Sequence, residues 1–210
     1  MKLADFAIDP DKRYTYKDYL SWPDELRCEL INGVIYDMCA APRRVHQDVS
    51  RDLTEIFIDF FKRKPCKVYV APFDVLLTAF GDRESDSDTV VQPDLSVFCD
   101  RSKLTASGAT GAPDLAVEIL SPSTAFKDQE EKRILYERHR VREYWVINPA
   151  NETAMIYALG DDGKFQRPRL VCRGETIEST IFPGLEAAID AIMPPDAEEE
   201  PAADVKPPAE

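Results

Sequence analysis

The sequence predicts an α/β fold of the α+β type, with helices and strands in irregular order. An Asn32-Gly33 pair between two β-prone runs predicts a hairpin. Residues 46–64 repeat apolar side chains at three- and four-residue steps, which predicts a long helix. Two apolar strands are predicted at 90–98 and 112–123. Because the predicted order does not alternate strictly between strand and helix, a mixed sandwich is favoured over a doubly wound parallel sheet.

The chain length of 210 residues fits one domain with a tail. Hydrophobic residues make up 44%, which is ordinary for a globular protein. We assign residues 1–193 to the domain. Residues 194–210 are rich in Pro, Ala and acids and cannot bury enough apolar surface to order themselves, so we expect a disordered tail.

The formal net charge of −13 argues against a simple nucleic-acid binder, which would usually be basic. The tail holds six acids and one lysine, so part of the charge is local, but the rest of the chain is acidic too. DNA binding would therefore need basic residues gathered on one face. The candidates for such a basic stripe are Arg43, Arg44, Lys62, Arg63, Lys64 and Lys67.

No apolar run approaches the roughly 20 residues that span a bilayer, and the start lacks the apolar segment of a secretory signal. We therefore expect a cytoplasmic protein without membrane contact. The five cysteines are odd in number, widely spaced and without a Cys-x-x-Cys pair, which predicts neither a zinc site nor a disulfide framework. We expect each to pack as a small hydrophobe with a free thiol.

The N-terminal half begins with a short predicted helix over 14–22, with Thr15 as its N-cap. The hairpin strands follow at 27–31 and 34–38, which places Glu29 on a strand. After the long helix, residues 67–79 are predicted as a strand with a possible break at Pro72.

In the C-terminal half, a Gly/Ser/Thr-rich connection at 101–111 joins the two apolar strands. The remaining predicted elements are a helix at 124–140, a strand at 142–149, a hairpin of 153–159 with 164–172, a short strand at 176–181 and a helix at 185–193.

Each of the two apolar strands carries an acid, Asp94 in the first and Glu118 in the second. A buried carboxylate is costly unless it is paired, hydrogen-bonded or bound to a cation. Two carboxylates at the edge of one apolar sheet indicate a divalent-metal hydrolytic site. The competing interpretation is structural: Pro93-Asp94 opens a strand, and Glu118 forms a buried ion pair with Arg or Lys.

Other polar residues say less. Lys132 lies four positions after Asp128, a spacing that is common on solvated helix faces, so it matters only if its helix crosses the mouth of the two strands. We interpret His46 as an exposed helix-start residue and assign no role to His139. Two histidines exclude a His-rich metal site. The sequence also lacks a Gly-x-Ser-x-Gly elbow and any Gly-rich phosphate-binding fingerprint.

A set of short motifs resembles the Uma2 (Uma-two) family of bacterial proteins. These motifs are Tyr16-x-x-Tyr19-Leu20, Glu29-Leu30-Ile31-Asn32-Gly33, Ala71-Pro72-Phe73-Asp74, Pro93-Asp94, Glu118-Ile119-Leu120-Ser121-Pro122-Ser123, Asp128, Lys132, Tyr136 and Glu143-Tyr144-Trp145-Val146. The resemblance covers residues 14–184. That family is similar to the restriction-endonuclease-like superfamily, named for its Pro-Asp … Asp/Glu-x-Lys motif, PD-(D/E)XK.

The resemblance implies a restriction-endonuclease-like core, with a central mixed sheet flanked by helices and additional hairpins. It also implies that Asp94 and Glu118 bind Mg2+, or Mn2+, and adds Glu29 to the site. The sequence departs from the superfamily motif at Leu120, where the motif has its lysine. Lys132 matches a lysine that has migrated to the following helix, with Lys127 as the alternative. A long Lys side chain can reach one site from more than one element.

The leading hypothesis is a Mg2+-dependent DNA endonuclease with Glu29, Asp94, Glu118 and Lys132 as catalytic residues. By analogy with enzymes that cut both strands, we expect a homodimer. The alternative is a catalytically weak or inactive nuclease-fold module that binds or regulates together with a partner protein. The acidity of the chain motivates that alternative.

Overall fold

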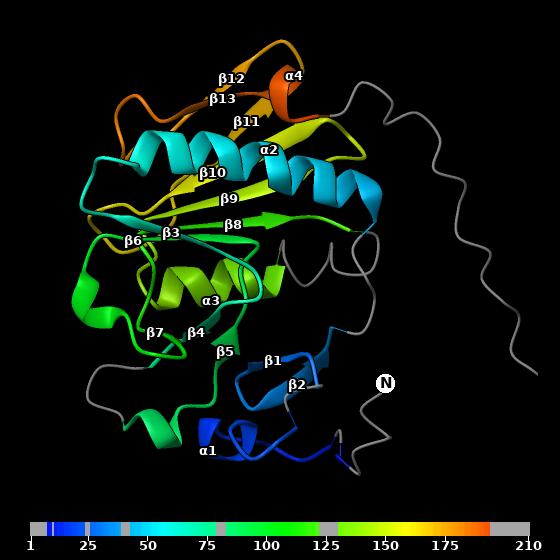
Figure 1. Cartoon of the computed structure of the whole chain (residues 1–210), viewed down its shortest axis with the longest axis vertical. Helices are drawn as coiled ribbons and strands as arrows, with labels where there is room; N and C mark the ends of the chain where they lie inside the picture. Colours follow the sequence, from blue (N-terminus) through cyan, green and yellow to red (C-terminus); the bar gives the residue numbers. More distant parts are fainter. Residues whose placement is uncertain are drawn as a thin grey trace, which may run out of the picture.

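The structure is a computed structural model that describes residues 8–9, 11–23, 26–38, 43–78, 83–121 and 130–193. The predicted tail lies outside these residues. Figure 1 shows a layered arrangement, with one large sheet in the upper half, helix α3 (Lys132–Arg138) below it, and a second sheet further down. The predicted α+β class is confirmed.

The larger sheet has six strands in the order β11-β10-β9-β8-β6-β3. Their bounds are β3 Lys67–Val70, β6 Leu95–Phe98, β8 Leu115–Ile119, β9 Glu143–Asn148, β10 Thr153–Ala158 and β11 Arg169–Cys172. The sheet is mixed, because β8 pairs with β9 in parallel and the other neighbours are antiparallel. Strands β8 and β9 are buried along almost their whole length, as expected for strands covered on both faces.

Helix α2 (Arg44–Phe61) covers one face of this sheet, as Figure 1 shows. Its buried side chains Val49, Leu53, Phe57 and Phe61 are the stripe that the three- and four-residue spacing predicts. They pack against β6, β8 and β9, where Trp145 meets Phe57 edge to face. The short sheet of β12 (Thr176–Glu178) and β13 (Glu186–Ala188), with α4 (Ile189–Ile192), completes this core.

The smaller sheet has five strands in the order β2-β1-β5-β4-β7. Their bounds are β1 Cys28–Ile31, β2 Val34–Asp37, β4 Asp74–Leu76, β5 Val90–Val91 and β7 Gly108–Thr110. The predicted hairpin at Asn32-Gly33 joins β1 to β2, and both turn residues have the positive φ that this turn requires. Helix α1 (Tyr16–Tyr19) carries the predicted Thr15 cap. The one-turn 3-10 helices η2 (Glu84–Asp86) and η3 (Arg101–Lys103) lie in connections.

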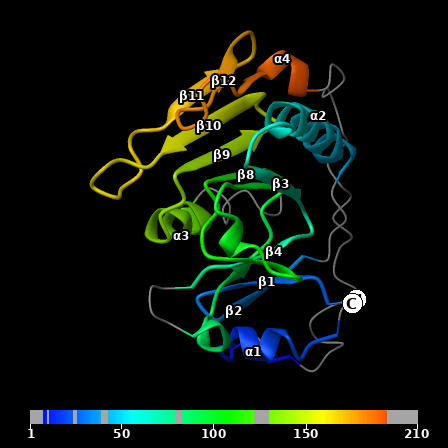
Figure 2. The ribbon, with the colours of Figure 1, turned by 60° about the vertical axis from the view of Figure 1, so that its left-hand side comes forward.

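Helix α3 lies between the two large sheets, as Figures 1 and 2 show. Its Leu135 and Tyr136 belong to one core cluster with Tyr144 of the six-stranded sheet and with Val75 and Val91 of the five-stranded sheet. The face of the six-stranded sheet opposite α2 is thus covered by α3 and, beyond it, by the smaller sheet.

Three predicted segments differ in the structure. The connection expected at 101–111 contains strand β7. The expected strand at 90–98 is two strands, β5 and β6, because Gln92-Pro93-Asp94 interrupts the ladder. At this segment the chain passes from the smaller sheet to the larger. Proline has no amide hydrogen for a sheet ladder, which explains the break. The expected helix at 185–193 instead begins as strand β13, whose Ala187 pairs with Ile177, and only its end is helical.

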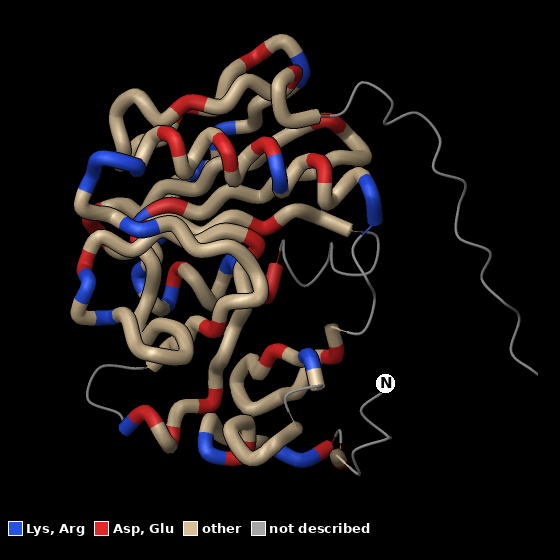
Figure 3. Tube along the Cα trace, viewed as in Figure 1, with Lys and Arg blue, Asp and Glu red and all other residues tan. Residues whose placement is uncertain are grey.

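The candidate residues for a basic stripe lie in two groups at the two ends of α2. Arg43 and Arg44 lie at the start of α2, whereas the cluster at 62–64 follows its end. An 18-residue helix separates them, about 27 Å at 1.5 Å per residue. The acids along this helix are Asp48, Asp52, Glu55 and Asp59, and Figure 3 shows red segments between the blue ends.

Within the described residues, no helix is long and apolar enough to cross a membrane.

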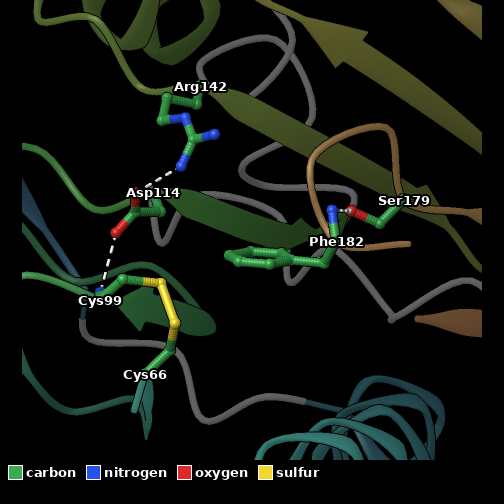
Figure 4. Close-up of a disulfide and its surroundings, with 6 residues drawn as sticks. All are labelled: Cys66, Cys99, Asp114, Arg142, Ser179 and Phe182. Carbon is green, nitrogen blue, oxygen red and sulfur yellow. Dashed lines mark hydrogen bonds and ion pairs between the residues drawn. A yellow bond between two sulfur atoms is a disulfide. The ribbon is translucent and has the colours of Figure 1, made fainter. Parts of the chain in front are cut away.

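The prediction that all five thiols are free was wrong for one pair. Cys66 and Cys99 form a disulfide (Figure 4). They continue the β3–β6 register by one step, since Lys67 pairs with Phe98. The amide of Cys99 donates to Asp114, which also binds Arg142.

Cys28 is a buried free thiol, and burial raises its pKa to about 12. Cys172 is also free, and Cys39 lies outside the described residues.

We expect reduction of this disulfide by dithiothreitol to lower the free energy of unfolding by about 3–4 kcal/mol. The reason is that the bond closes a loop across a separation of 33 residues and so restricts the unfolded chain. Urea denaturation with and without reductant measures the effect. The matched control is a Cys66→Ala/Cys99→Ala double variant, whose stability should not respond to reductant. An equal response in both proteins would contradict the assignment.

Candidate active site

The chain segment that changes sheets also brings the acids together. Leu95 of β6 pairs with Val117 of β8 in antiparallel register, so Asp94 and Glu118 are the next opposed positions at this edge of the larger sheet. Gln92 lies in the segment between β5 and β6, and its backbone amide donates to Glu29 Oε1 of β1 at 2.9 Å. Glu29 therefore reaches the site from the smaller sheet.

A buried ion-pair cluster forms the centre of the site. Lys132 Nζ, at the start of α3, lies 2.6 Å from Glu118 Oε1 and 2.8 Å from Glu29 Oε1. The three residues are almost fully buried, with 0%, 4% and 2% of Glu29, Glu118 and Lys132 exposed. At such burial an unpaired charge would be strongly destabilising, so the single ammonium stabilises both carboxylates. Helix α3 therefore brings Lys132 to the end of the strand that carries Glu118, which is the arrangement that the sequence requires for Lys132 to belong to the site.

Tyr136 completes the surroundings of Glu118. Its hydroxyl donates to Glu118 Oε1 at 2.8 Å from one helical turn beyond Lys132. Full burial, and next the charge of Glu118, raise the pKa of Tyr136 well above its usual value. The phenol therefore stays protonated and remains a donor. Glu118 Oε1 thus accepts hydrogen bonds from both Lys132 and Tyr136.

Asp94 lies at the more accessible side of the site, with 18% of its side chain exposed. Its Oδ2 accepts a hydrogen bond from the amide of Ile119 at 2.7 Å, and its Oδ1 lies 3.3 Å from His46 Nε2. The interpretation of His46 as an exposed helix-start residue was wrong, because only 14% of its side chain is exposed. The first turn of α2 points His46 back across the sheet edge onto Asp94.

A second hydrogen-bond group supports Glu29 from the smaller sheet. Gln92 Nε2 donates to Asp74 Oδ1 at 2.7 Å, and the hydroxyl of Tyr19 donates to the same oxygen at 3.1 Å. Burial raises the pKa of Tyr19, and the charge of Asp74 adds to this rise, so the phenol is a donor here. Helix α1 is thereby connected to the segment that carries Asp94.

The donor chemistry fits a hard divalent cation. Asp94 and Glu118 offer carboxylate oxygens from neighbouring strands, and Mg2+ in proteins commonly takes one or two carboxylates plus water and phosphate. Across the described residues, no group of three or more His, Cys, Asp or Glu side chains is arranged to hold a metal ion. With three carboxylates and one ammonium, the site keeps an excess of negative charge when all four groups are ionised. A cation would reduce that excess.

The remaining candidates do not enter this arrangement. Leu120, at the superfamily's lysine position, packs in the core between the two sheets. The ammonium comes instead from α3. Lys127 and Asp128 lie outside the described residues. His139 follows α3 at its far end, where burial and the neighbouring Arg138 lower its pKa.

Comparison with known proteins shows that this mixed α+β fold resembles that of a solved nuclease-like protein. A crystal structure described as "a putative nuclease belonging to DUF820" from Anabaena variabilis superposes with a TM-score of 0.68 at 20% identity, covering 85% of this chain and 97% of that one. The family model Uma2, described as "Putative restriction endonuclease", matches residues 16–190. The chain belongs to the Uma2 family. An uncharacterized protein of Synechocystis sp. is 25% identical over 157 residues, which are 73% of this chain and 78% of that protein.

The sequence motifs include the four charged residues of the site and Tyr136, but they give no role to Tyr136, His46 or Gln92. Lys132 and Tyr136 are four residues apart, which places both side chains on the same face of a helix. His46 and Gln92 carry weaker signals, since both contacts depend on how separate elements meet.

We expect Lys132→Met to lower the free energy of unfolding by about 3–5 kcal/mol, because it leaves Glu29 and Glu118 buried without their cation. Urea denaturation measures the loss. The double variant Glu29→Gln/Lys132→Met should recover part of it, since one buried charge is removed. The matched control is Lys164→Met, an exposed lysine, which should change stability by less than about 0.5 kcal/mol. Equal losses for the two single variants would contradict the buried cluster.

Proposed function

We propose that this chain is a Mg2+-dependent DNA endonuclease that hydrolyses phosphodiester bonds. The observation that supports this most is the placement of Lys132, whose ammonium meets Glu118 and Glu29 from a helix. Asp94 lies opposite Glu118, immediately before β6. The membership in a family described as nucleases supports the same reaction class.

Each residue of the site has a distinct part in this proposal. Asp94 and Glu118 would hold the metal, and Lys132 would orient the attacking water and offset charge that develops on the phosphate. Glu29 orients the Lys132 ammonium, and Tyr136 fixes one oxygen of Glu118 by its hydrogen bond. His46 and the amide of Ile119 hold the Asp94 carboxylate. When bound, Mg2+ or Mn2+ would supply Lewis acidity and a water of lowered pKa.

The substrate in this proposal is DNA, and the assembly is a homodimer. Cutting both strands of a duplex takes two sites of opposite orientation, which a two-fold dimer provides. The acidic body and the absence of a continuous basic stripe along α2 imply few phosphate contacts. We therefore expect DNA affinity to fall with added salt, but with a shallow slope.

A catalytically weak binding module is the second candidate. The observation that favours it is the near-complete burial of Lys132, whose ammonium is already shared between two carboxylates. In that case a partner protein, and not a scissile phosphate, would be the ligand. Cleavage assays separate the two functions.

We expect the wild-type protein to cut supercoiled plasmid with Mg2+ or Mn2+, and Asp94→Asn to abolish cleavage while keeping the hydrogen bond from Ile119. Lys132→Arg, which keeps the charge but not the compact ammonium, should lower the rate by about 10²- to 10³-fold. The control is Lys64→Ala, a lysine beyond the far end of α2. Circular dichroism verifies that each variant is folded. Cleavage by Asp94→Asn at the wild-type rate would exclude the assignment.

We also expect Mg2+ or Mn2+ to raise the melting temperature, because a ligand bound only by the native state stabilises it. The gain is about 2.7 kcal/mol at a metal concentration of 100 times Kd. Differential scanning calorimetry of wild type and Asp94→Asn measures it, and Asp100→Asn serves as the control because Asp100 is exposed. Equal shifts in all three proteins would mean that the metal binds elsewhere.

A further inference from the structure

A pocket of about 330 Å³ is formed between α3 and the connection from β10 to β11, and none of the candidate active-site residues lines it. Its lining residues are Arg133, Tyr157, Phe165, Gln166, Arg167 and Pro168. We call it the Arg133–Arg167 pocket. Arg133 comes from α3, Tyr157 from β10, and the rest from the connection between β10 and β11. Figure 2 shows this connection and α3 on the same side of the molecule.

The pocket is linked to the site through the backbone of α3 and through a series of packed aromatic side chains. Arg133 directly follows Lys132 on α3. Tyr136, the donor to Glu118, packs edge to face on Tyr144 with ring centres 4.9 Å apart. Tyr144 stacks on Tyr157 at 5.9 Å, and Tyr157 contacts Phe165 at 5.7 Å. Three ring contacts thus connect Tyr136 to the pocket wall.

The wall of the pocket is held in place by specific contacts. The amide of Phe165 donates to Glu137 Oε2 of α3 at 2.7 Å, and the amide of Gln166 donates to Ala158. Gly163 has a φ of +74° and packs against the guanidinium of Arg140, where a β-carbon would overlap that group. The backbone of the connection is therefore fixed to α3 at Phe165, to the end of β10 at Gln166, and against Arg140 at Gly163.

The charges of the pocket are available for a ligand. Arg167 is exposed and makes no ion pair with the part of the chain that the structure describes. Arg133 has one weak contact, 3.6 Å to Glu130, a residue whose side chain is 57% exposed. Glu137 is the acid nearest to the wall in these contacts, and it is already engaged by the Phe165 amide and by Lys164.

This combination of groups matches a nucleotide. Guanidinium groups bind phosphate oxygens by paired hydrogen bonds, and aromatic faces stack on bases whatever the sequence. The Gln166 amide offers a donor and an acceptor. The volume is at the lower end of the range for small-ligand pockets, which suits a single nucleotide unit.

We propose that the Arg133–Arg167 pocket holds one nucleotide of the DNA strand that the active site cuts, with its phosphate on the two arginines and its base against Phe165. This proposal rests on the proposed function, because the pocket's connection to Lys132 and Glu118 is what favours a strand over a free nucleotide. The pocket would give this acidic chain a local DNA-binding site on α3. The basic residues at the ends of α2 do not form such a site, because acids lie between them. The unit held there flanks the scissile phosphate and does not react.

The test is equilibrium binding of a fluorescein-labelled oligonucleotide, single-stranded and duplex, followed by anisotropy in an Asp94→Asn background that prevents cleavage. Arg167→Ala should weaken binding by about tenfold, and the slope of log affinity against log salt should fall by about 0.7–0.9, the value for one lost phosphate contact. Phe165→Leu, which keeps an apolar side chain, should weaken binding by about fivefold or more through lost stacking.

The matched control is Lys164→Ala, which removes one positive charge from the same connection without lining the pocket. If Arg167→Ala and Lys164→Ala weaken binding equally, the effect is long-range charge and the pocket proposal is overturned. If deoxynucleoside monophosphate binds with dependence on Arg167 while the oligonucleotide does not, the pocket takes free nucleotides, and the proposal for a strand is overturned.

Cleavage of plasmid by the same variants without the Asp94 change keeps this test separate from that of the nuclease. Mg2+-dependent cleavage together with Arg167-independent binding would overturn the pocket and leave the nuclease. Arg167-dependent binding of DNA by a protein that never cuts would support the pocket and overturn the nuclease.

Discussion

One buried ammonium group joins the two large sheets. Lys132 binds Glu118 of the six-stranded sheet and Glu29 of the five-stranded sheet from a helix that lies between them. Because all three side chains are almost fully buried, the ion pairs are stable only while both sheets are docked on α3. The site therefore forms only when the two sheets and α3 are correctly packed. A site built on one sheet would not depend on the packing of a second.

The sequence predicts the chemistry of the site better than its assembly. Acids within apolar strands are unusual enough to single out Asp94 and Glu118. Their opposition across β6 and β8 follows from the fold, but Glu29 reaches them only because Gln92-Pro93 carries the chain between sheets, and propensity does not encode that path. The same limit explains His46 and the Cys66–Cys99 bond, since each depends on the register or angle at which distant elements meet. Local patterns found the hairpin and α2, where neighbours along the chain decide the structure.

Electrostatics separates the two surfaces on which DNA could lie. The exposed side of α2 alternates in charge sign, and its arginines are engaged by acids such as Asp48. Arg133 of α3 and Arg167 of the β10–β11 connection instead place guanidinium groups beside aromatic rings that are packed on the same core as Tyr136. An acidic protein can thus approach a polyanion through a small site whose attraction is local, because charges farther away than about 8 Å are largely screened at physiological salt.

The early position of Glu29 in the chain has a consequence for any shortened form of this protein. A fragment starting at α2 would retain Asp94, Glu118 and Lys132, and would contain the whole Pro-Asp to Lys region. It would lack β1 and β2, and with them the inner strand on which β5 pairs. Lys132 would keep only one of its two counter-ions. The smallest autonomous unit that can be engineered from this chain therefore has to begin before the Asn32-Gly33 turn.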